Sequence, residues 1–106
     1  MQFTLSPNIA IEFPQAAEAA AMYANLLGIE PKQVDHSSIE LQQSGRYLYF
    51  DEHDGFRIVM ELFVDDVEAA RAELISLGWT VEAWQGKGDR CYMKDPYGLY
   101  FNLWQS

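Results

Sequence analysis

The stretch KDPYGLYFNLW, at residues 94–104, combines a tight turn with a strand. Asp95, Pro96 and Gly98 occupy the first, second and fourth positions of a type I turn, where these residue types are favoured. The Asp95 carboxylate is expected to accept hydrogen bonds from backbone amides that follow it. The residues after the turn are mostly aromatic or large and apolar, which is typical of a strand.

The two faces of this last strand differ because side chains alternate along a strand. One face is purely apolar and should pack against a helix or a second sheet: Leu99, Phe101, Leu103. The other face mixes rings with an amide: Tyr100, Asn102, Trp104. This mixture suits the wall of a ligand cleft, and it is equally compatible with a half-exposed strand face.

Composition limits the class of protein. The chain has 106 residues, of which 49% are hydrophobic and 14% aromatic, so we expect a single folded domain. No apolar run approaches the roughly 20 residues of a membrane span, and no secretory signal is visible, so a cytoplasmic location without membrane attachment is expected. Cys91 is the only cysteine, which excludes an intramolecular disulfide and predicts a small buried residue.

The formal net charge of −9 comes from 16 acidic and 7 basic residues. Nucleic acid requires basic patches, so this balance argues against a nucleic-acid partner. It keeps a small protein soluble and permits a cationic partner.

Hydrophobic periodicity predicts two helices among short strands. The strands are expected at residues 8–13, 32–36, 38–43, 46–52, 57–64, 79–85, 90–94 and in the last stretch. The first helix, residues 16–27, should end at Gly28 and bury Ala16, Ala19, Ala20, Tyr23, Leu26 and Leu27. The second should be capped by Asp65 or Asp66, end at Gly78 and bury Val67, Ala70, Leu74 and Leu77.

The chain contains an internal repeat. AEAA at residues 17–20 and LG at 27–28 recur as VEAA at 67–70 and LG at 77–78. Strand, helix and three strands thus occur twice, which predicts an α+β fold of two tandem βαβββ modules, about residues 1–55 and 56–106. They should form a curved mixed sheet with helices on the outer faces. The inner side would carry Asn8, Ala10, Glu12, Val59, Glu61, Phe63, Tyr100, Asn102 and Trp104.

This organisation resembles the vicinal oxygen chelate superfamily, which includes glyoxalase I, bleomycin-resistance proteins and extradiol dioxygenases. The resemblance covers essentially the whole chain. It is carried by the Leu-Gly helix ends, by FVDDV at residues 63–67 and by KDPYG at 94–98. The fold hosts lyases, isomerases, dioxygenases, thiol transferases and binding proteins, so the resemblance alone does not choose a function.

Metal-dependent members of this superfamily hold a divalent ion with His or Glu side chains on the inner strands. The resemblance places these positions at Asn8, Val59 and Asn102, with a fourth among Tyr49, Asp51 and Glu52. Valine cannot bind a metal, and amides are poor replacements for imidazole or carboxylate. The resemblance therefore implies a member without the family's metal site, and no cofactor is expected.

The first functional hypothesis is a non-enzymatic binder that sequesters a cationic aromatic compound, as bleomycin-resistance proteins do. Aromatic residues would supply contact area and cation–π contacts, and acidic residues would supply attraction. The ligand-binding residues would be Asn8, Glu12, Tyr49, Glu61, Phe63, Trp84, Tyr100, Asn102 and Trp104. The resemblance also implies a homodimer.

Two alternatives remain. Glu12 and Glu61 could act as acid and base in a glyoxalase-like lyase or isomerase or a dioxygenase, with an atypical or absent metal site. These carboxylates could equally anchor a ligand's cationic group or merely line a hydrated cleft. The other alternative is a subunit or regulator with a vestigial cleft.

Overall fold

The computed structural model describes residues 2–84, 86 and 88–106 of the chain. It divides into two compact units. We call Pro7–Ile58 the N-terminal unit, and Met1–Ser6 with Val59–Ser106 the C-terminal unit. The predicted α+β fold of two βαβββ repeats is confirmed by the element order.

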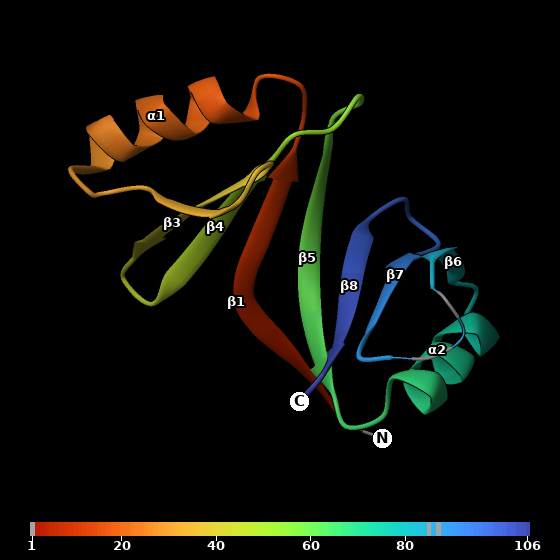
Figure 1. Cartoon of the computed structure of the whole chain (residues 1–106). Helices are drawn as coiled ribbons and strands as arrows, with labels where there is room; N and C mark the ends of the chain where they lie inside the picture. The colour runs from red at the N-terminus through yellow and green to blue at the C-terminus, as the bar shows by residue number, and fades with distance from the viewer. Residues whose placement is uncertain (1, 85, 87) are drawn as a thin grey trace. The chain divides into compact units, whose positions relative to one another are not determined.

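The N-terminal unit contains one helix and four strands. In chain order they are β1 (Phe3–Glu12), α1 (Ala16–Leu27), β2 (Lys32–Asp35), β3 (Ser38–Gln43) and β4 (Arg46–Asp51). Their order in the sheet is β2-β3-β4-β1, in which β1 runs parallel to β4 and the other pairs are antiparallel. Helix α1 lies over β3 and β4 (Figure 1). The core between them contains Ala16, Ala20, Ala24, Leu41 and Phe50.

The C-terminal unit repeats this plan. Its elements are β5 (Arg57–Val64), which starts two residues before the unit does, α2 (Val67–Ser76), β6 (Thr80–Ala83), β7 (Arg90–Lys94) and β8 (Tyr100–Gln105). Their order is β5-β8-β7-β6, with β5 parallel to β8. Helix α2 packs on β6, β7 and β8. The core beneath it contains Val64, Val67, Ala70, Leu74, Cys91, Met93 and Leu103.

The predicted turn before β8 is confirmed. Asp95 Oδ1 accepts hydrogen bonds from the backbone amides of Tyr97 and Leu99, both at 2.8 Å. Gly98 has a φ of 96°, a left-handed value that glycine adopts without steric cost. The turn thereby fixes where β8 begins.

The helix ends also follow the sequence signals. Asp66, not Asp65, caps α2, because its Oδ1 accepts from the Ala69 amide at 3.0 Å. Gly28 ends α1 in the left-handed conformation, with a φ of 69°. Gly78 follows the Leu77 cap of α2 and is also left-handed, with a φ of 95°, so both helices end at the predicted Leu-Gly boundaries.

The first strand is longer than predicted. It begins at Phe3 and continues through Pro7, whereas the sequence pattern predicted a start at Asn8. Proline is normally confined to strand edges and ends, so the residues before it gave no strand signal. Phe3 packs against the core of the C-terminal unit, which accounts for the ordered extension. Strand β6 ends at Ala83; the predicted end at Gln85 and Lys87 of the following hairpin lie outside the described residues.

The predicted apolar stripes of the helices are partly wrong. Leu26 of α1 is 70% exposed, and Leu77 after α2 is 64% exposed. On α1 the buried stripe consists of three alanines four residues apart: Ala16, Ala20 and Ala24. Leu26 falls outside it, because residues two positions from Ala24 point to a different side of the helix. No helix in the described part of the chain is long and apolar enough to span a membrane.

Candidate ligand-binding face

The register of the C-terminal unit places nine side chains on one face of its sheet. Directly paired residues on neighbouring strands share a face. Taken across β5, β8 and β7, the three rows are Phe63–Trp104–Arg90, Glu61–Asn102–Tyr92 and Val59–Tyr100–Lys94. We call this set the C-terminal strand face. It is opposite the core under α2, to which β8 contributes Leu103.

A carboxylate is held at the centre of one edge of this face. Ser6 Oγ donates to Glu61 Oε1 at 2.9 Å, and Asn102 Nδ2 donates to Glu61 Oε2 at 2.8 Å. Ser6 and Asn102 are buried, at 7% and 6% exposure, while Glu61 is half-buried. Both of these donors are neutral, so these two hydrogen bonds orient the Glu61 carboxylate without contributing a positive charge. An oriented, partly accessible carboxylate can bind a cation or accept a proton.

Two cations occupy the opposite edge of the same face. The Arg90 guanidinium lies over the Trp104 ring, 4.8 Å from its centroid. The Lys94 ammonium lies 5.6 Å from the centroid of the Tyr100 ring. Within the described part of the chain, neither cation forms an ion pair with a carboxylate. The rings that were predicted to contact a ligand's cation therefore already contact cations of the protein.

Trp84 does not lie with the other predicted site residues. It packs against the core beneath α2, and the Arg71 guanidinium from that helix lies 4.2 Å from its ring centroid. Cys91 is fully buried in the same core, as predicted. Burial raises the pKa of the Cys91 thiol, and the positive charge of Arg71 opposes this only in part.

The remaining predicted residues lie in the N-terminal unit. There Asn8 pairs with Tyr47, Ala10 with Tyr49, and Glu12 with Asp51, so these six share a face of β1 and β4. Tyr49 donates to Glu40 Oε1 of β3 at 3.4 Å. This face is therefore richer in acidic groups than the C-terminal strand face.

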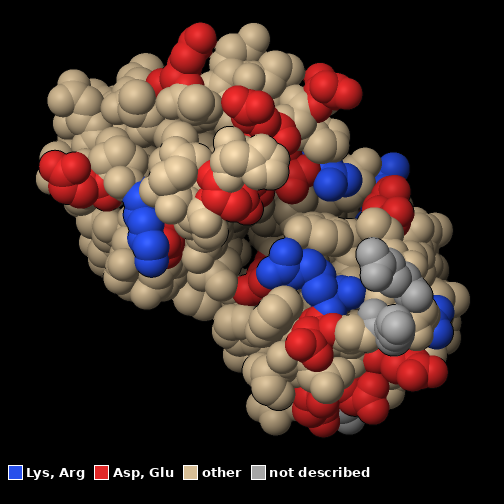
Figure 2. All heavy atoms as spheres, viewed as in Figure 1, with Lys and Arg blue, Asp and Glu red and all other residues tan. Residues whose placement is uncertain are grey.

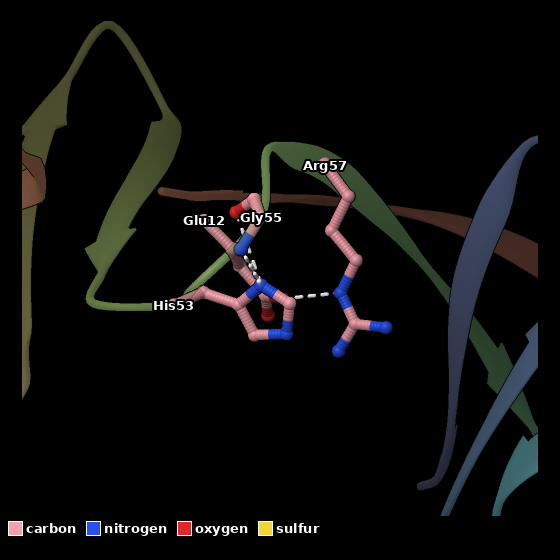
Figure 3. A network of polar contacts seen from close by, with 4 residues as sticks. All are labelled: Glu12, His53, Gly55 and Arg57. Atoms are coloured by element: carbon pink, nitrogen blue, oxygen red, sulfur yellow. Dashed lines mark hydrogen bonds and ion pairs between the residues drawn. The ribbon is translucent and has the colours of Figure 1, made fainter. Parts of the chain in front are cut away.

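Glu12 already has a cationic partner in its own unit. The Arg57 Nε donates to Glu12 Oε1 (Figure 3). Glu12 is only 7% exposed, so this ion pair compensates a buried charge. Nearby, His53 Nδ1 lies 3.0 Å from the carbonyl oxygen and 3.2 Å from the amide nitrogen of Gly55, which closes the turn at the surface (Figure 3). Glu12 therefore has a structural role within the N-terminal unit.

The register identifies the β4 residue that is equivalent to Asn102 of β8. In the C-terminal unit the resemblance implies the positions Val59, which pairs with Tyr100, and Asn102, two residues further along β8. In the N-terminal unit Asn8 pairs with Tyr47, so the equivalent residue two further along β4 is Tyr49. The four positions that the resemblance and the internal symmetry imply are thus Asn8, Tyr49, Val59 and Asn102. This donor set does not fit a divalent ion, since it offers neither imidazole nor carboxylate.

The described residues also contain no alternative group of three His, Cys, Asp or Glu side chains suited to a metal ion. At the surface, acidic side chains are spread over the view in Figure 2, with a few basic side chains between them. The net charge of −9 makes the electrostatic potential around the protein negative overall. Arg90 and Lys94 place two positive charges on the C-terminal strand face.

Sequence reasoning missed Ser6, Arg90 and Lys94. Ser6 precedes the predicted start of its strand, so no face could be assigned to it. The alternation in RCYMK, residues 90–94, would have separated Arg90, Tyr92 and Lys94 from the buried Cys91 and Met93. Placing them beside Asn102 required the pairing register.

Comparison with known proteins agrees with this architecture. The family model for the glyoxalase-like domain matches residues 8–104. No curated protein matches the sequence.

Three solved structures illustrate the likeness. The Mn(II)-bound glyoxalase from Novosphingobium aromaticivorans is 24% identical, with a TM-score of 0.72 over 98% of this chain and 39% of that chain. Homoprotocatechuate 2,3-dioxygenase from Arthrobacter globiformis is 19% identical, with a TM-score of 0.73 over 99% of this chain and 37% of that chain. A glyoxalase/bleomycin resistance protein/dioxygenase superfamily member from Vibrio splendidus 12B01 is 13% identical, with a TM-score of 0.67 over 99% and 100%.

The chain spans about two-fifths of the first two of these proteins and the whole of the third. At these identities the likeness shows a shared fold. Together with the family model, which covers nearly the whole sequence, it establishes that this chain belongs to the glyoxalase-like domain family of the vicinal oxygen chelate superfamily.

Proposed function

We propose that this protein is a non-enzymatic small-molecule binder that sequesters a cationic aromatic compound, in the manner of bleomycin-resistance proteins. The C-terminal strand face is the binding surface, and Glu61 is the anchor for the ligand's cationic group. The observation that carries the proposal is the Ser6–Glu61–Asn102 group, in which two buried neutral donors hold a half-buried carboxylate.

Aromatic side chains around this carboxylate support the choice of an aromatic ligand. Phe63 and Trp104 form the row on one side of Glu61, and Tyr100 belongs to the row on the other. All three are half-buried, so they offer apolar area without being sealed in a core. A rigid ring gives large contact area at low entropic cost, and a carboxylate beside it fixes the ligand's orientation.

The donor set at the family's metal positions supports binding over metal-assisted catalysis. A divalent ion polarises an oxygen or activates water, and it requires imidazole or carboxylate ligands to do so. Asn8, Tyr49, Val59 and Asn102 do not supply them. The alternative, a glyoxalase-like lyase or isomerase or a dioxygenase, would need a relocated metal site or acid–base chemistry at Glu61.

Thermal unfolding with a matched metal analysis tests the proposal. The additives are benzylamine, cationic glycopeptide drugs, Mn²⁺, Ni²⁺, Zn²⁺ and EDTA. Saturation at about 100 times the dissociation constant adds roughly 2.7 kcal/mol of stability, which means a shift of several degrees for a domain of this size. We expect a cationic aromatic compound to raise the Tm of metal-free protein, and Glu61→Gln to abolish that shift.

A stabilisation by a divalent ion that EDTA reverses, without any shift by the cationic compounds, would favour the enzyme alternative. Unchanged melting with every additive would favour the vestigial regulator. Size-exclusion chromatography with light scattering tests the accompanying proposal that the chain forms a homodimer.

A further inference from the structure

Arg90 and Lys94 have no function in the binding of a simple cation, yet both lie on the proposed binding face. They are two residues on either side of Tyr92 in β7, so their Cα atoms are roughly 13 Å apart at about 3.3 Å per residue. Their positions follow from the same alternation that buries Cys91 and Met93 on the other side of the strand. Both cations therefore point away from the core under α2.

Each of the two cations is held by a ring of the neighbouring strand. Trp104 faces the Arg90 guanidinium and Tyr100 faces the Lys94 ammonium. A cation–π contact orients a cation but does not cancel its charge. Since neither side chain pairs with a carboxylate among the residues that the structure describes, each keeps its capacity for an anion.

We propose that the ligand is amphoteric: beyond the cationic group that Glu61 anchors, it carries a carboxylate that binds to one of the two cations, Arg90 or Lys94. This inference rests on the proposed function and narrows its ligand class. Glu61 lies on β5 and the two cations lie on β7, with β8 between them, so the two charge types are about 10 Å apart across the sheet. The ligand's ammonium and carboxylate are therefore at opposite ends of a planar ring.

The charge of the whole protein makes this local pattern informative. A net charge of −9 disfavours the approach of anions, so binding of a carboxylate requires a local concentration of positive charge. Two of its seven basic residues nevertheless lie on this one face, each fixed by a ring. Arg90 also offers a planar fork that matches a carboxylate with two hydrogen bonds.

Three compounds that share a benzene ring test the two charged groups of the ligand separately. 4-(Aminomethyl)benzoate carries an ammonium and a carboxylate, benzylamine carries only the ammonium, and benzoate carries only the carboxylate. Titrations of the full-length protein are followed by amide resonances in NMR spectra, which also report folding. We expect 4-(aminomethyl)benzoate to bind about tenfold more tightly than benzylamine, as a charge-assisted hydrogen bond allows. The largest shifts should come from β5, β7 and β8.

The double variant Arg90→Gln/Lys94→Gln should lose this preference, so that the ratio of its affinities for 4-(aminomethyl)benzoate and benzylamine falls to about one. Arg46→Gln serves as the control, because it removes a positive charge from an exposed position of β4 outside the proposed site. Arg90→Lys retains the positive charge and should keep most of the preference for 4-(aminomethyl)benzoate. This result would show that the double variant loses the preference because charge is removed and not because the protein misfolds.

Equal affinity of the wild type for benzylamine and 4-(aminomethyl)benzoate would overturn this inference and leave the proposed function intact. A preference that survives in the double variant would overturn it as well. If neither compound bound, both the proposed function and this inference would be contradicted.

Discussion

Asp95 stabilises the turn before β8 through a single carboxylate oxygen, which accepts from two backbone amides at 2.8 Å. Asp95→Ala removes both bonds, and we expect it to lower the free energy of unfolding by about 1–3 kcal/mol. Asp95→Asn retains an acceptor and should cost less. Urea unfolding of both variants measures the difference, and equal stabilities of the two would contradict this role.

Cys91 provides a prediction about pH and reactivity. Because burial raises its pKa, the folded protein holds the thiol in its protonated form where an exposed cysteine would begin to ionise. A thiol-specific reagent should therefore react slowly with native protein and rapidly after denaturation. The raised pKa also makes the free energy of unfolding depend on pH. Above the ordinary thiol pKa, Cys91 loses its proton in the unfolded chain before it does so in the folded protein, so the folded state becomes less stable. Rapid reaction of the native protein would contradict this account.

Single residues differ in how far sequence reasoning could place them. Asp95 and Cys91 depend on local signals, namely turn chemistry and an apolar strand position, and both were predicted correctly. Ser6 and Arg90 depend on which strands are neighbours and in which register. Local patterns do not contain that information, so these residues were not recognised.

Among the elements, the two helices differ in whether a leucine near the helix end is buried against the sheet. Leu74 of α2 is 5% exposed in the core, while Leu26 of α1 is 70% exposed. We expect Leu74→Ala to destabilise the protein by about 2–4 kcal/mol and Leu26→Ala to change stability by less than about 0.5 kcal/mol. Chemical denaturation measures both, and a large cost for Leu26→Ala would show that its side chain is covered in solution.

Strands β1 and β5 are joined within the N-terminal unit by the Glu12–Arg57 ion pair. Arg57→Met leaves the buried Glu12 carboxylate without this partner and should cost about 2–3 kcal/mol, less than a fully buried pair because Arg57 is partly exposed. The double variant Glu12→Gln/Arg57→Met should recover part of that loss. Chemical denaturation of both single variants and the double variant measures this coupling. If the losses of stability in Glu12→Gln and Arg57→Met simply add up in the double variant, the ion pair is contradicted.

For the whole molecule, the internal repeat was the most useful sequence signal. Recurring motifs such as Leu27-Gly28 and Leu77-Gly78 predicted two equivalent modules, and symmetry then constrained elements whose own patterns were weak. The same repeat later fixed Tyr49 as the β4 equivalent of Asn102, which strand periodicity alone could not do. The site was less predictable, because Trp84 lies on the helix side of its sheet and cations of the protein occupy the rings.

The charge of the whole protein predicts how ligand binding depends on salt. A net charge of −9 attracts cations over a distance set by the Debye length. The affinity for benzylamine should therefore fall as sodium chloride is raised from 20 to about 300 mM. Titrations at both concentrations measure this dependence, and an affinity that is independent of salt would contradict an electrostatic anchor.

Binding of benzylamine to EDTA-treated protein, compared between wild type and Glu61→Gln, shows whether Glu61 anchors a cation without a metal ion. Glu30→Gln, which removes an equal charge from an exposed loop, is the control. We expect saturable binding to metal-free wild type and to the control, with an affinity that is about tenfold or more lower in Glu61→Gln. Binding that requires a divalent ion, or that Glu61→Gln leaves unchanged, would contradict metal-independent binding anchored by Glu61.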